Sequence, residues 1–193
     1  VYMSNSPETL IADFALNKIG AIAGPINCWW KAEEVRYLLN DSHGRGIIIH
    51  PEYLPIMDEI RRGCPYVEFI VEAGASPREE NIPFGALLDN PDDLAPVKIS
   101  PDDHSYIFYT SGTTGNPKGV LLTHLNTLCA VRGIRDVLHS EEEEEDDVAL
   151  IFLPLFHVNA MMSCVSAVNS GITVALRKGF SATEFWDCVQ RYR

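Results

Sequence analysis

The stretch "YTSGTTGNPKG", Tyr109 to Gly119, places three glycines, four small hydroxyl residues and one lysine directly after an apolar run. Glycines allow backbone angles that turn several N–H groups towards one anion, and the hydroxyls and the lysine add further donors. The pattern differs from a Walker A loop, because Pro117 precedes the lysine and Gly119 stands where that loop needs a hydroxyl. These residue types favour a phosphate-binding loop over a plain surface turn.

Strand-like and helix-like segments alternate on both sides of this loop. The apolar spacing predicts helices starting after Ser6 and over 32–39, 56–62, 125–138, 158–168 and 182–192, and strands over 21–27, 46–50, 67–71, 106–109, 148–153 and 172–176. Repeated strand–helix units imply a mainly parallel sheet covered by helices. We therefore expect an α/β fold in two layered halves, residues 1–100 and 101–193. The polar, proline-rich stretch 72–104 would act as a linker between them.

Composition narrows the class of protein. The chain has 193 residues, a net charge of -12 and 46% hydrophobic residues, which is typical of a globular protein and argues against a nucleic-acid partner. No apolar run is long enough to span a membrane. Five cysteines without a CxxC pair indicate buried free thiols in a reducing, cytoplasmic compartment. Seven consecutive carboxylates, Glu141 to Asp147, predict a solvated acidic loop and no metal cluster.

The longer motif "YTSGTTGNPKGV" resembles the signature loop of the adenylate-forming enzymes, the superfamily of acyl-CoA synthetases, peptide-synthetase adenylation domains and firefly luciferase. The resemblance extends over the whole chain, through "IADFALNKIGAIAGPINCWWKAEEVRYLLNDSHGRGIII" and "LPLFHVNAM" to the C-terminal segment. It implies that the fold is part of a larger adenylate-forming enzyme. It also implies that the protein uses a carboxylic acid, ATP, Mg²⁺ and CoA.

The resemblance also implies roles for individual residues. The ATP phosphates would be held by Thr110, Ser111, Gly112, Thr113, Thr114, Gly115 and Lys118, with Lys118 as an electrostatic clamp on the leaving pyrophosphate. His157 would lie beside the reacting carboxylate. Asn159 and Met161 would line an acyl pocket, although a methionine-rich helix face is equally typical of plain core.

The function implied is that of an acyl-CoA synthetase, with the "PLFHV" motif favouring it over an amino-acid-activating adenylation domain. Two further alternatives are a non-catalytic nucleotide-binding fragment or pseudoenzyme and a purely structural α/β module. The family's adenine segment, its Mg²⁺-associated glutamate and its C-terminal lid domain have no counterpart up to Arg193. We therefore expect a longer enzyme, and no catalysis by these 193 residues alone. The identity of the acid and the oligomeric state stay open.

Overall fold

A computed structural model of the chain describes residues 1–91, 95–110, 115–138 and 147–192. Its longer helices and its strands are, in chain order, α1 (Pro7–Lys18), α2 (Ala32–Asp41), β1 (Gly46–Ile49), α3 (Leu54–Ile60), β2 (Phe69–Glu72), β3 (Ile82–Pro83), α4 (Phe84–Leu88), β4 (His104–Thr110), β5 (Lys118–Thr123), α5 (His124–Leu138), β6 (Val148–Ile151), α6 (Val158–Asn169), β7 (Thr173–Leu176) and α7 (Phe185–Arg191). Short 3₁₀ turns precede and follow α3, at Pro51–Tyr53 and Arg61–Gly63.

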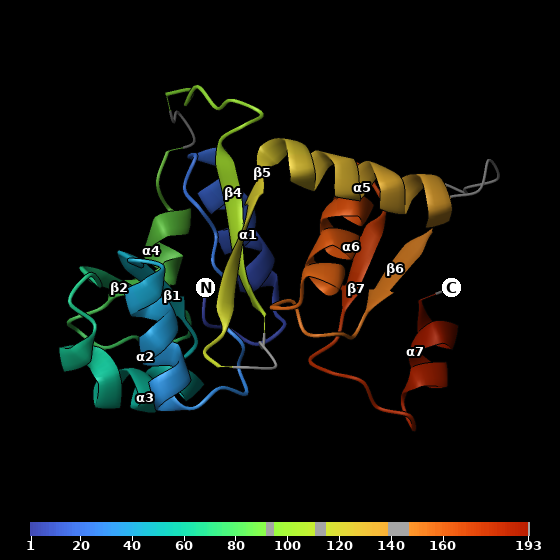
Figure 1. Cartoon of the computed structure of the whole chain (residues 1–193). Helices are drawn as coiled ribbons and strands as arrows, with labels where there is room; N and C mark the ends of the chain where they lie inside the picture. Colours follow the sequence, from blue (N-terminus) through green and yellow to red (C-terminus); the bar gives the residue numbers. More distant parts are fainter. Residues whose placement is uncertain (92–94, 111–114, 139–146, 193) are drawn as a thin grey trace.

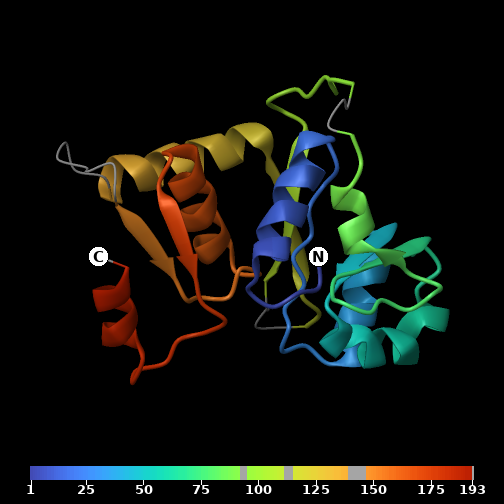
Figure 2. The same cartoon turned by 180° about the vertical axis from the view of Figure 1, so that it is seen from behind.

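The strands pair mostly in parallel. β1, β2 and β3 form one parallel sheet, and β6 and β7 form another, while β4 and β5 form an antiparallel hairpin. This confirms the expected α/β class with mainly parallel pairing. The hairpin lies between the two parallel sheets, with α1 packed along it (Figures 1 and 2).

The start of α1 is determined by residues next to it in the sequence. Ser6 has extended backbone angles, and its hydroxyl accepts a hydrogen bond from the N–H of Thr9, which caps the helix. Pro7 then occupies a first-turn position where no N–H donor is needed, and Glu8 places a negative charge near the N-terminus. These local signals explain why the start of α1 agrees with the sequence prediction.

Three buried clusters hold the elements together. The first packs α2 and α3 against β1, around Val35, Leu38 and Ile47. The second joins the hairpin to α5 and α6, around Tyr106 and Met161. The third, smaller cluster buries Met3, Ala12, Val71, Ala73 and Phe84. The hairpin therefore shares its core with the elements that follow it.

Several expectations need correction. Residues 21–27 form no strand, because Pro25 has no N–H donor to continue the ladder; only Ala23 makes a single bridge, to Tyr106. The stretch 72–104 contains β3 and α4, and β3 pairs with β2. Of the five cysteines, Cys64, Cys164 and Cys188 are buried, whereas Cys28 is half-buried and Cys129 is exposed.

Two other expectations concern specific parts of the chain. Residues 139–146, most of the acidic run, lie outside the described residues. Within the described ranges, no helix has the length and apolar character needed to cross a bilayer.

Candidate functional site

A cleft of about 240 Å³ lies where three separate segments meet. One is the connection between α1 and α2, the second is the end of β4, and the third is the loop from β6 into α6. The lining residues are Pro25, Asn27, Trp30, Phe108, Tyr109, Thr110, Phe156, His157 and Val158. The cleft therefore brings together two residues that the sequence proposed for separate roles, Thr110 and His157.

The first wall of the cleft is built on a turn that Asn27 organises. The Asn27 side-chain oxygen accepts a hydrogen bond from the N–H of Trp29 at 2.9 Å, and its backbone carbonyl accepts one from the N–H of Trp30 at 3.1 Å. Trp29 is 71% exposed, yet its ring packs edge-on against Phe156, with centroids 5.1 Å apart. This aromatic contact connects the first wall to the third.

The second wall is the end of β4. The Tyr109 hydroxyl donates a hydrogen bond of 2.6 Å to Asp41 at the end of α2, and its ring meets Trp30 edge-on. Burial, followed by the hydrogen bond to Asp41, raises the pKa of the Tyr109 phenol well above its ordinary value. Tyr109 therefore stays a neutral hydrogen-bond donor and fixes the strand end from which the glycine loop departs.

The glycine loop connects β4 to β5. Thr110 and Lys118 are cross-strand partners at its base, and both are exposed. Gly115 has φ of +152°, a conformation that side-chain-bearing residues rarely adopt. Ser111, Gly112, Thr113 and Thr114 lie outside the described residues, so their predicted phosphate contacts remain a prediction.

The third wall begins α6. His157 is the N-cap of α6 with extended backbone angles, and its carbonyl accepts a hydrogen bond from the N–H of Met161. The positive end of the helix dipole therefore faces the cleft at Val158. Asn159 is exposed on α6 and does not line the cleft. Met161 is only 1% exposed and belongs to the second core cluster, which favours the plain-core alternative for it.

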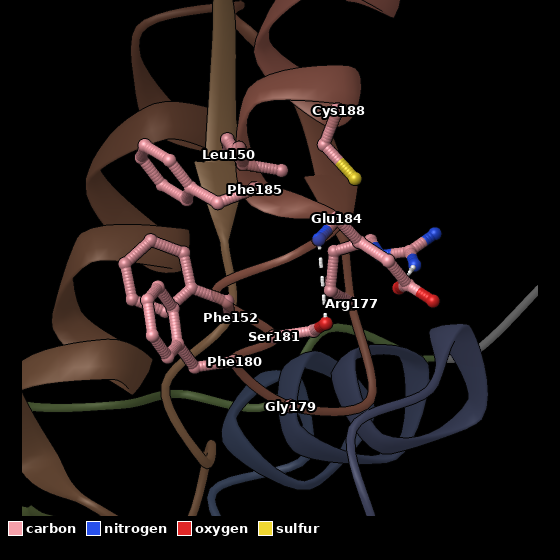
Figure 3. A pocket seen from close by; sticks show the side chains of 9 residues that line it. All are labelled: Leu150, Phe152, Arg177, Gly179, Phe180, Ser181, Glu184, Phe185 and Cys188. Atoms are coloured by element: carbon pink, nitrogen blue, oxygen red, sulfur yellow. Dashed lines mark hydrogen bonds and ion pairs between the residues drawn. The ribbon is translucent and has the colours of Figure 1, made fainter.

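A second hollow lies between the ends of β6 and β7 and helix α7 (Figure 3). Phe152, Phe180 and Phe185 pack on one another there, with centroid separations between 5.2 and 5.9 Å. Its volume is about 10 Å³, roughly enough for one water molecule. This hollow is a packing gap, and the larger cleft is the candidate site.

The sequence matches the family model of the AMP-binding enzymes over residues 1–193. The chain belongs to this family. The family of this AMP-binding chain agrees with the resemblance drawn from its sequence. Phosphate binding by the glycine hairpin stays a prediction.

Relatives of this AMP-binding chain are CoA ligases. It is 34% identical to a crotonobetaine/carnitine–CoA ligase of Citrobacter koseri and 32% identical to the long-chain-fatty-acid–CoA ligase FadD13 of Mycobacterium tuberculosis. The alignments cover 100% and 99% of the chain but only 38% and 37% of the relatives. The chain therefore spans well under half the length of the curated relatives that it matches.

Solved structures agree with the fold of this AMP-binding chain. The inhibitor-bound N-terminal domain of FACL13 from Mycobacterium tuberculosis superimposes with a TM-score of 0.84 at 30% identity, covering 97% of the chain and 46% of that domain. The anthranilate CoA ligase AuaEII in complex with anthranoyl-AMP superimposes with a TM-score of 0.85 at 28% identity. That match covers 99% of the chain and 36% of the ligase.

Sequence reasoning missed part of the cleft. Asn27, Trp30 and Tyr109 line it but received no role, because the cleft forms only when the α1–α2 connection folds onto the end of β4. A sequence signal existed in the two adjacent tryptophans, Trp29 and Trp30, which stand just before α2 in the connection between two helices.

Proposed function

We propose that the protein containing this chain is an ATP-dependent carboxylate–CoA ligase. A carboxylate oxygen attacks the α-phosphorus of ATP, and the bond from that phosphorus to the bridging oxygen breaks, giving an acyl-adenylate and pyrophosphate. The CoA thiol, losing its proton, then attacks the acyl carbon and AMP leaves with the bonding pair. The observation that supports this most strongly is the single cleft in which the base of the glycine hairpin meets His157.

In this proposal, the β4–β5 hairpin binds the phosphates of ATP. Pyrophosphate carries more negative charge as it leaves, and preorganised donors stabilise that charge. Lys118 and Thr110 are cross-strand partners at the base of the hairpin, so their side chains project from the same face and both can reach one phosphate group.

The acid side belongs to the loop before α6. His157 lies between the aromatic ring of Phe156 and the first turn of α6, and it lines the same cleft as Thr110. A carboxylate bound in this cleft would lie near both His157 and the strand end that leads into the glycine loop. Binding both reactants in one cleft lowers the activation free energy, because the entropy cost of bringing them together is met on binding.

Mg²⁺ is an expected partner of ATP in such a reaction. Within the described part of the chain, no three His, Cys, Asp or Glu side chains gather closely enough to hold a metal ion. The described residues therefore form no metal cage of their own, and a Mg²⁺ ion bound with ATP would take most of its ligands from the phosphates and from water.

Acid-dependent exchange of labelled pyrophosphate into ATP, measured with the natural full-length protein, tests the proposal. The panel of acids should include carnitine, crotonobetaine, long-chain fatty acids and anthranilate, which the names of the relatives suggest. Exchange with at least one acid, followed by thioester formation when CoA is added, is the expected result. Exchange without thioester would indicate an adenylating domain that does not use CoA. Binding of ATP without any exchange would indicate a non-catalytic protein.

A further inference from the structure

Asn5 connects the N-terminal segment to the site loop through three hydrogen bonds. Its side-chain nitrogen donates to the carbonyls of Leu153 and Arg177, both at 2.9 Å, and its side-chain oxygen accepts from the N–H of Leu155 at 2.8 Å. Leu153 follows β6 and Arg177 follows β7, so one amide bridges the carboxyl ends of both parallel strands. Leu155 lies two residues before His157.

Asn5 is itself held rigidly. The residues on both sides of it are anchored by Thr9 in the first turn of α1. The Thr9 hydroxyl donates to the carbonyl of Ser4 at 2.8 Å, and the Thr9 N–H donates to the hydroxyl of Ser6 at 3.2 Å. Asn5 is only 7% exposed, so water does not compete well for its hydrogen bonds. The N-terminus of α1 thus provides a fixed platform from which the amide reaches the site loop.

Asn5 is one of several anchors of the site loop, since Leu155 is buried in the second core cluster and Phe156 packs on Trp29. Within Pro154–His157, the one backbone turn hydrogen bond joins the N–H of His157 to the carbonyl of Pro154, at 3.0 Å. An amide supplies two donors and one acceptor from a single planar group, which neither a carboxylate nor a hydroxyl can do. The three bonds of Asn5 therefore add polar anchors to these apolar contacts and fix the backbone where the loop leaves β6.

We propose that Asn5 is a positioning residue that places His157 against the carboxylic acid in the cleft. The proposal rests on the function proposed above for His157. Asn5 does not line the cleft, so it acts through Leu155 and the backbone that leads to His157. Loss of the amide should displace the acid side of the site and leave the hairpin, which holds the phosphates, in place.

The test uses pyrophosphate exchange by the natural full-length protein and its variants, with acid and ATP varied separately. Asn5→Ala removes the three bonds, while Asn5→Asp keeps the shape and the acceptor but turns a carboxylate oxygen towards two carbonyls. We expect kcat/KM for the acid to fall about 10- to 100-fold in both variants, since a shift of about 1 Å can cost about 100-fold. The KM for ATP should not change.

The matched control is Asn81→Ala. Asn81 is also a buried asparagine, its side chain donates to Glu72 of β2 at 2.7 Å, and neither residue lines the cleft. Its loss should lower the melting temperature without changing either KM. All variants are assayed below the onset of thermal unfolding, so the nearly isosteric Asn5→Asp still tests the proposal if Asn5→Ala does not fold.

His157→Ala, measured alongside, distinguishes a failure of the positioning role of Asn5 from a failure of the proposed function. If wild type catalyses exchange and His157→Ala raises the KM for the acid, but folded Asn5 variants resemble Asn81→Ala, the positioning role is wrong and the proposed function stands. If wild type shows no exchange with any acid, the proposed function itself fails. Equal loss of acid and ATP affinity in the Asn5 variants would also overturn the positioning role.

Discussion

Gly119 provides a sharp test of how the phosphate hairpin is built. It pairs across the hairpin with Tyr109, and a methyl group added at Gly119 would lie 2.9 Å from Ile107 Cδ1 and 3.1 Å from Tyr109 Cζ. The Ile107 methyl can rotate away at little cost. The Tyr109 ring cannot, because its hydroxyl is bonded to Asp41 at 2.6 Å. Gly119→Ala should therefore destabilise the protein by about 1–3 kcal/mol, the usual cost of overpacking.

Another glycine serves as the matched control. Gly133 lies within α5, and a methyl group added there meets nothing within 4 Å. Gly133→Ala should stabilise the protein by about 0.5–1 kcal/mol, because alanine loses less conformational freedom in a helix. Thermal unfolding of the natural full-length protein should show opposite shifts in melting temperature for the two substitutions.

Gly119→Ala should also lower the activity of the protein. Gly119 adjoins Lys118, so movement of β5 away from Tyr109 also moves the lysine that we assign to the phosphates. We expect pyrophosphate exchange by Gly119→Ala to slow by about 10- to 100-fold. A Gly119→Ala protein as stable as wild type, with unchanged exchange, would refute the close approach of Tyr109 and β5.

Three other predictions follow from the described residues. Lys118→Ala should slow pyrophosphate exchange roughly 10- to 1000-fold with little change in melting temperature, because the side chain is exposed. His157→Ala should raise the KM for the acid in the same assay and leave that for ATP unchanged; a shift confined to ATP would contradict its placement. Burial raises the pKa of the Asp13 carboxyl to about 6. The stability that the protonated carboxyl contributes to the fold is therefore fully present below about pH 4 and is lost as the pH rises through 6. Asp13→Asn should therefore gain up to about 3 kcal/mol relative to wild type between pH 4 and 7, read from melting temperatures across that range.

The sequence predicted those elements whose signals are local. α1 was predictable from Ser6, Pro7 and Glu8, since a cap and a first-turn proline act within one helical turn. β5 and its antiparallel pairing with β4 were not predicted, because the short run 118–123 was not assigned to a strand and hydrophobic spacing does not encode strand direction. Residues 21–27 failed as a strand because their apolar pattern was read without enough weight on the missing N–H of Pro25.

The residues of the candidate site also fall into those that a local motif predicted and those that only tertiary packing brings together. Thr110 and Lys118 were predictable because a single contiguous motif holds both. Trp30 and Asn27 were not, since they reach the cleft from a segment about 80 residues earlier, and only tertiary packing brings them there. Asn5 left no sequence signal, because its partners are backbone groups, which every residue type presents alike.

The three hydrogen bonds of Asn5 also determine when this site can form during synthesis and folding. Its most distant partner, Arg177, lies 172 residues further along the chain. At a synthesis rate of about 5–20 residues per second, Asn5 waits on the order of 10 to 30 s before that partner exists. During this interval α1 can form, but the loop before α6 has no fixed path. Closing so long a span of chain is slow, so the acid side of the cleft should be among the last parts to become protected from hydrogen exchange as the protein folds.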